Sequence, residues 1–236
     1  DMRHAHRLVE SSLLWVLVII AVMVTPAVRA QAEETTAWEP RVGDQDWSSF
    51  FNWSNGHPTP VIDAYIDGPV PAIVDSHDYA AATYIGTEGE QGGTVIVKDG
   101  ALHSFHVVVG GEGPGLLTQA GGDVIIDGRL RMNASENSRY ELAKGMLIVC
   151  GALEMRSPLS SFEQSGGDVY AMTYTVIDGS YNLAGGTLNA LGNQTVRGRL
   201  TQSGGFHNVQ GDLHVARSWW DPSGTAPAVY RLDGGV

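Results

Sequence analysis

The chain has 236 residues, 30 glycines and a formal net charge of −12 at pH 7. A chain this acidic has no electrostatic footprint for nucleic acid or for an anionic membrane surface, so neither is an expected partner. Cys150 is the only cysteine, which excludes an internal disulfide and leaves stability to a packed core.

The first 30 residues have the features of a secretory signal peptide. Arg3 and Arg7 precede an unbroken apolar run over residues 13–24, and residues 28–30 place small side chains where signal peptidase reads them. The run is shorter than the roughly 20 residues that span a bilayer. We therefore predict cleavage after Ala30 and export to the cell surface or the medium. The alternative is an uncleaved membrane anchor.

Residues 31–46 are polar and acidic without periodicity, and they predict a flexible lead-in. An aromatic cluster follows, with Trp47, Phe50, Phe51 and Trp53 ahead of an Asn-Gly turn. Because the open end of a repeat fold exposes its core and an unpaired strand edge, we expect this cluster to form an N-terminal cap. The folded domain is then expected over residues 47–236.

Beyond the cap, short runs of Val, Ile, Leu and Tyr alternate with turns. The runs at 61–66, 94–98 and 124–126 are each followed by Asp-Gly. No stretch of ten residues after position 31 keeps a helical period with caps. The chain is therefore expected to be all-β.

Six segments of one shape, two types in alternation, occupy residues 117–122, 140–145, 162–167, 181–186, 200–205 and 230–235. Their third residues are Gln119, Gln164 and Gln202 in one type, and Leu142, Leu183 and Leu232 in the other, where Tyr always stands two residues earlier. Their last residues are Gly122, Gly145, Gly167, Gly186, Gly205 and Gly235. Self-similarity at such a period predicts a solenoid.

The period favours a parallel β-helix with rungs of about 19–23 residues, because a propeller blade needs roughly 40–50 residues and sandwich strands recur every 8–12. Parallel crossovers are right-handed, so the coil is expected to be right-handed. In stacked rungs the glutamines and leucines named above form one inward column. A buried glutamine needs partners, and the backbone of the adjacent Gly-Gly turn is the expected one.

These motifs resemble a known group. The signal peptide, the Asn-Trp-Ser-Asn-Gly stretch at 52–56 and the Gln-Ser-Gly-Gly and Leu-Ala-Gly-Gly turns resemble secreted, planctomycete-like bacterial β-helical proteins with autotransporter-associated β-strand repeats. The resemblance covers roughly residues 46–236. It implies a surface or extracellular β-helix, often with a PEP-type sorting segment, and no particular activity. Since the chain ends in mid-repeat, we expect a fragment whose anchor lies downstream.

The sequence offers little sign of catalysis. The Asn-Thr-Asp, Asp-Asp and Gly-His-Gly motifs of β-helical galacturonan hydrolases are absent, and the basic residues look scattered. Asp127 and Asp178 precede Gly, where Asp is favoured for turn geometry. We therefore predict no catalytic residue, no metal ligand and no cofactor. Calcium is a weak candidate, because Gly121-Gly122-Asp123 touches the edge of a calcium-binding repeat.

Trp219 and Trp220 interrupt the repeat with a longer loop, and insertions in solenoids often lie on a binding face. The two interpretations are stacking on a sugar ring and a hydrophobic plug under the loop. The leading hypothesis for the chain is a non-enzymatic scaffold, stalk or adhesin segment. The alternative is a polysaccharide-binding module or a carbohydrate-active β-helix enzyme. Extracellular polysaccharides or surface components are the expected partners, and membrane contact is expected only through the signal peptide or a downstream anchor.

Overall fold

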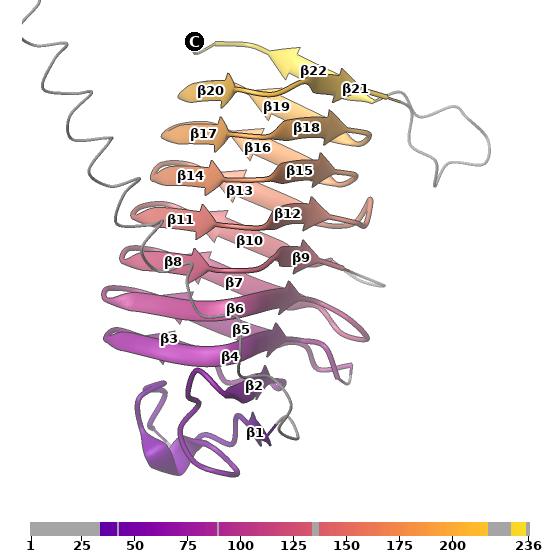
Figure 1. Cartoon of the computed structure of the whole chain (residues 1–236). Coiled ribbons are helices and arrows are strands. Elements are labelled where there is room, and N and C mark those ends of the chain that lie inside the picture. The colour runs from indigo at the N-terminus through magenta and orange to yellow at the C-terminus, as the bar shows by residue number, and fades with distance from the viewer. Residues whose placement is uncertain (1–33, 42, 89, 134–136, 217–227, 235–236) are drawn as a thin grey trace, which may run out of the picture. The chain divides into compact units, whose positions relative to one another are not determined.

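The computed structural model describes residues 34–41, 43–88, 90–133, 137–216 and 228–234. In these residues parallel strands stack into two long sheets that coil into a β-solenoid (Figure 1). The one helical element described is a single 3₁₀ turn, η1 (Phe50–Asn52). No helix among the described residues is long and apolar enough to cross a membrane.

The eight-stranded sheet forms one side of the coil, which we call face 1. Its strands are β3 (Ala72–Val74), β5 (Gly93–Val97), β7 (Gly115–Gln119), β10 (Arg139–Leu142), β13 (Ser161–Gln164), β16 (Ser180–Leu183), β19 (Arg199–Gln202) and β22 (Val229–Leu232). Each strand pairs in parallel with the strand one rung away.

The fourteen-stranded sheet supplies the other two sides. Face 2 comprises β8 (Asp123–Ile126), β11 (Met146–Val149), β14 (Asp168–Ala171), β17 (Thr187–Ala190) and β20 (Phe206–Val209). Face 3 comprises β9 (Leu130–Met132), β12 (Ala152–Met155), β15 (Tyr174–Ile177), β18 (Asn193–Val196) and β21 (Leu213–Val215). The long strand β6 (Ala101–Val109) pairs with both faces, and β4 (His77–Ile85), β2 (Ile62–Ile66) and β1 (Glu34–Ala37) continue the sheet toward the N-terminal end.

Each rung runs through face 1, face 2 and face 3 before the chain moves up by one level. In Figure 1 the chain passes rightward along the front strands, returns behind them and rises, which is a right-handed coil. The all-β class, the parallel β-helix and its handedness were therefore predicted correctly.

The interior is built by alternation. In β11, β14 and β17 every second residue is buried, as expected for strands with one face on a core. The third residues of the repeats are Cα partners in one unbroken column, which runs Gln119, Leu142, Gln164, Leu183, Gln202 and Leu232. The first five of these are buried, and Leu232 on the last described strand is exposed.

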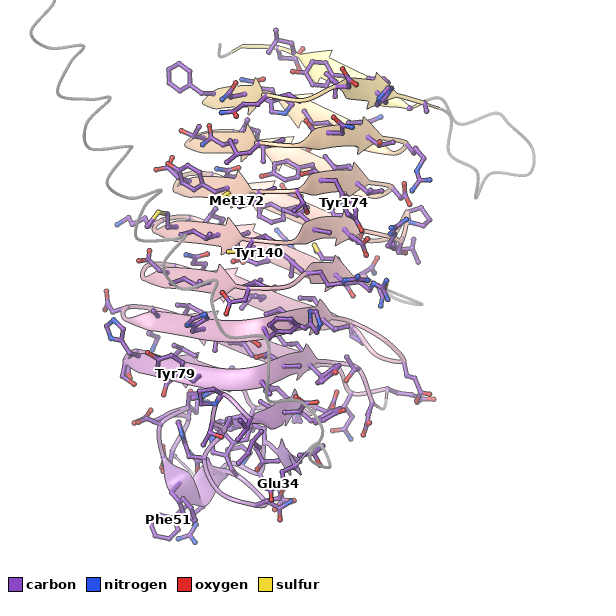
Figure 2. The ribbon with its side chains drawn as sticks, in the orientation of Figure 1. Glu34, Phe51, Tyr79, Tyr140, Met172 and Tyr174 are labelled. Atoms are coloured by element: carbon purple, nitrogen blue, oxygen red, sulfur yellow. The ribbon has the colours of Figure 1, made fainter. Side chains whose placement is uncertain are left out.

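A second column lies two residues earlier on the same strands. Tyr140, Phe162 and Tyr181 stack their rings with centroids 4.6 Å apart and planes within 6° of parallel. All three side chains are fully buried, and Figure 2 marks Tyr140 in the stack. Because a rung advances by one strand spacing of about 4.8 Å, rings in register are held face to face along the axis.

The buried glutamines find their partners both within and between rungs. Nε2 of Gln119 donates to the carbonyl oxygens of Gly122 (2.8 Å) and Met146 (2.9 Å). Oε1 of Gln119 accepts a bond of 2.7 Å from the Tyr140 hydroxyl on the next rung. Gln164 repeats this arrangement with Tyr181, at 2.6 Å. The turn backbone is thus a partner, as expected, and the tyrosine is a second partner that the sequence interpretation missed.

The Gly-Gly turns connect face 1 to face 2 and stack on one another. Gly145 illustrates why glycine is needed, since its φ of +84° lies in the left-handed region. A Cβ at this position would also stand 1.7 Å from the carbonyl oxygen of Gly122 in the turn below. Gly122, Gly167, Gly186 and Gly205 also have positive φ, and Gly235 lies outside the described residues.

The N-terminal end differs from the expected boundaries. Residues 34–37 lie within the expected flexible lead-in, yet they form β1, which pairs in parallel with β2. A four-residue strand is too short to show a clear alternation, so this strand could not be predicted from the residues. Trp38 joins Trp47 and Trp53 in a buried cluster with ring centroids 4.8–5.0 Å apart. Phe51, expected in this cap, is exposed at the end of the coil (Figure 2).

Candidate binding site on the third face

The structure shows where most of the site residues predicted from the sequence lie. The Gln and Leu column fills the interior, and the glycines with positive φ make the turns between faces 1 and 2. Trp219 and Trp220 lie outside the described residues, so sugar stacking by that loop stays a prediction. Cys150 is partly buried in the turn after β11, where burial and then the charge of Asp127 raise the pKa of its thiol.

The most highly organised polar group on the outer surface surrounds Glu154, on face 3. Three side chains from successive rungs meet its carboxylate. Nε of Arg131 on β9 donates to Oε2 at 3.2 Å, and Nη2 of Arg156 donates to Oε1 at 2.7 Å. The Tyr174 hydroxyl on β15 also donates to Oε1, at 2.6 Å. We call Arg131, Glu154, Arg156 and Tyr174 the Glu154 cluster.

Strand register explains how these side chains meet. Arg131 and Glu154 are Cα partners on β9 and β12, and both point outward because their neighbours Leu130 and Leu153 point into the core. Tyr174 pairs with Ala152, two residues before Glu154, so its long side chain reaches diagonally across the sheet. In Figure 2 Tyr174 is labelled on this strand.

Glu154 is only 1% exposed, although it lies on the outer side of the sheet. Burial alone raises the pKa of its carboxyl, but the hydrogen bonds from Arg156, Tyr174 and Arg131 outweigh burial and lower that pKa to about 2. The same contact with Glu154 raises the pKa of Arg156. The carboxylate therefore stays charged and holds two guanidinium groups in place.

A second ion pair lies beside the cluster. Arg197, just after β18, donates from Nε and Nη2 to the two carboxylate oxygens of Asp178, at 2.6 and 3.0 Å. Asp178 is fully buried as a side chain. Asp178, expected to serve the turn, is thus also half of a bidentate ion pair, a strong and directional form of charge pairing.

Basic residues balance acidic ones in this part of the coil, unlike the part before it. Residues 34–128 contain fourteen acidic and two basic side chains, whereas residues 129–216 contain seven of each. Arg129, Arg131, Arg156 and Arg197 all lie at the ends of face 3 strands or on them. The coil thus brings these four arginines to one face, while Arg139 and Arg199 lie on face 1.

Face 1 carries a pair of carboxylates. Glu141 and Glu163 are Cα partners on β10 and β13, and both are half-buried. Arg139 donates to Glu141 at 2.9 Å, and Asn182 donates to Glu163 at 2.8 Å. The pair thus lies on a sheet surface with polar neighbours on either side.

The hollows in the described part of the chain lie elsewhere. One, of about 250 Å³, is lined largely by glycines and prolines, and its polar side chains are those of Gln91, Thr94, Asn137 and Arg139. Another, of about 400 Å³, is lined by Asp67, Gly68, Glu88, Glu90 and Gln91. Neither includes a residue of the Glu154 cluster, whose arginine and tyrosine side chains are partly exposed on the outer surface.

No group of three or more His, Cys, Asp or Glu side chains is assembled for a metal within the described ranges. Asp123, of the Gly-Gly-Asp turn, accepts a bond of 3.0 Å from the Met146 amide. His103 contacts Asp127 at 3.0 Å. Calcium binding stays a prediction without a described ligand set.

Comparison with known proteins finds no match: no family model, no curated protein and no solved structure is similar to this chain. The autotransporter-type likeness of the turns is therefore a likeness of motifs. The fold rests on the chain's own strand pairing, and the function must be argued from its own surface.

Proposed function

We propose that this chain is a non-enzymatic, secreted or cell-surface β-helical repeat protein that serves as a scaffold, stalk or adhesin-like segment. The observation that carries the proposal is the unbroken interior column from Gln119 to Leu232, with the stacked rings beside it. Such a column makes each rung a support for the next, so the coil is a stiff spacer.

The buried carboxylates also favour a structural role. Glu154 accepts three donors and Asp178 accepts two, and both carboxylates are buried, which keeps them away from a substrate. The signal-like N-terminus supports an extracellular place of action.

A first experiment tests the location. Proteolysis of intact native cells, or of their culture medium, should release peptides from the 47–236 region. Cells that protect these peptides until they are lysed would contradict the proposal.

The second candidate function is a carbohydrate-active enzyme, and the Glu141–Glu163 pair favours it. Adjacent strands lie about 4.8 Å apart, close to the roughly 5–5.5 Å between the carboxyl groups of retaining glycosidases. Incubation with pectin, alginate and xylan, followed by assays for reducing ends and unsaturated products, separates the two functions. The scaffold predicts no products, whereas turnover that is lost in Glu141→Gln or Glu163→Gln would establish the enzyme.

A further inference from the structure

We infer that the Glu154 cluster is a binding site for the acidic groups, carboxylate or sulfate, of an extended anionic polysaccharide. This inference deepens the proposed function, since it gives the non-catalytic coil a ligand and a place to hold it. The argument rests on charge, on available hydrogen-bond donors and on the spacing of the rungs.

The charge of the cluster does not balance internally. Two guanidinium groups share one carboxylate, so the cluster keeps an excess positive charge within an acidic protein. The charge of Asp178 acts on Arg156, but Asp178 is itself paired with Arg197, so the two ion-pair groups together keep one excess positive charge. Asp127, another acidic residue nearby in the sequence, contacts His103 of β6. The positive charge of Arg129 acts on the Tyr174 hydroxyl and so adds to the same region.

The guanidinium groups keep donors for a ligand. Each has five N–H donors in a planar fork. In contacts between described residues Arg131 uses one nitrogen and Arg156 uses one, both toward Glu154. Their side chains are 39% and 34% exposed, so the remaining donors can reach solvent. Planar forks of this kind match the oxygens of carboxylate and sulfate groups.

Glu154 holds these donors in a fixed position before any ligand binds. A free arginine loses side-chain entropy when it binds, whereas these two are already held in place by a buried carboxylate. Tyr174 is 38% exposed, and its hydroxyl is fixed by the same carboxylate. Its ring thus stands beside the guanidinium groups as an apolar surface on which a sugar ring can pack.

The arrangement favours an extended polymer over a small anion. The cluster draws on three successive rungs, which repeat about every 4.8 Å along the axis. This spacing is similar to the length of one sugar unit in an extended polysaccharide.

The test measures binding of the full chain to polygalacturonate, to dextran sulfate and to uncharged dextran, by affinity electrophoresis. We expect retardation by at least one of the two polyanions, weakened by added salt, and none by dextran. Binding to polygalacturonate alone assigns the site to carboxylates, and binding to dextran sulfate alone assigns it to sulfates. Failure to bind either, or equal retardation by dextran, would overturn the inference.

Variants locate the site. Arg131→Gln combined with Arg156→Gln should weaken binding at least roughly tenfold, since it removes both forks. Arg199→Gln is the control for one unit of charge, because Arg199 is exposed on face 1 and belongs to neither ion-pair group. It should change the affinity less than about twofold, and a loss as large as that of the double variant would indicate diffuse charge attraction and reject the site.

If the double variant melts early, Arg156→Lys keeps the charge and removes the fork, so a folded Arg156→Lys with unchanged affinity would also reject the site. If single-stranded DNA retards the chain equally, the site binds polyanions in general and the assignment to a polysaccharide is wrong. A failure of binding leaves the scaffold proposal standing, whereas cleavage products would overturn the scaffold and leave the binding site intact.

Discussion

The hydroxyl of Tyr181 offers the most direct test of how the rungs are held together. It donates to Oε1 of Gln164 at 2.6 Å, and both side chains are at most 1% exposed. Tyr181→Phe keeps the ring stacked on Phe162, at 4.6 Å and 4°, and removes only the donor. Burial raises the pKa of Tyr181 well above its ordinary value, so the lost group is a protonated donor at every pH of the experiment.

Without this donor, Oε1 of Gln164 is left buried and unpaired, at a cost of about 1–3 kcal/mol in the free energy of unfolding. Urea unfolding of the wild type, Tyr181→Phe, Gln164→Leu and the double variant measures the cycle. We expect the two changes to be coupled by about 1–2 kcal/mol, because each removes the same bond.

Tyr170→Phe is the matched control, since Tyr170 is a half-buried residue on the outer side of β14. Its effect should stay within about 0.5 kcal/mol. If Tyr181→Phe and Tyr170→Phe have equal effects, or if the cycle shows no coupling, then the Tyr–Gln bond does not stabilise the coil.

Three further predictions concern charge and pH. Leu183→Asp puts a charge into the interior column and should destabilise the coil by several kcal/mol in thermal melts, whereas Asn189→Asp on the outer face should change little; equal shifts would refute the inward assignment. Glu154 has a lowered pKa of about 2 in the folded chain, so its stabilising contribution is present above about pH 4.5 and is lost as the pH falls toward 2. In a plot of melting temperature against pH, the fall at acid pH should be smaller for Glu154→Gln than for the wild type. An equal fall in both would exclude this contribution. Burial lowers the pKa of His207 to about 4, so the hydrogen-exchange protection factors of β20 should fall as the pH drops from 6.5 to 4, and His207→Gln should remove that fall.

The interior column could be predicted because its signal lies in a single short motif repeated along the chain. Leu at the third place of alternate repeats shows that this place points inward, and register then carries Gln164 inward as well. The tyrosine donors were harder to see. Tyr140 and Tyr181 each occur on the rung after a glutamine, while Phe162 follows a leucine. The tyrosine and the glutamine of each pair are 17 or 21 positions apart in the chain. Their contact can be recognised only when it is known which rungs are neighbours.

The Glu154 cluster shows the limit of the sequence more clearly. Arg131, Glu154, Arg156 and Tyr174 share no motif, because the outward residues of a β-helix are not constrained by the repeat. Only the stacking of β9, β12 and β15 brings these side chains within hydrogen-bonding distance.

By itself the sequence determined the all-β class, the period of the coil, the inward column and the turns that require glycine. These follow from local rules, since side-chain alternation and backbone conformation repeat within each rung. The tertiary structure decided that residues 34–37 join the sheet, that tyrosines satisfy buried glutamines, and that dispersed arginines meet around Glu154. The physical reason is that a parallel coil makes neighbours of residues about twenty positions apart, so contacts between rungs depend on register and not on adjacency in the chain.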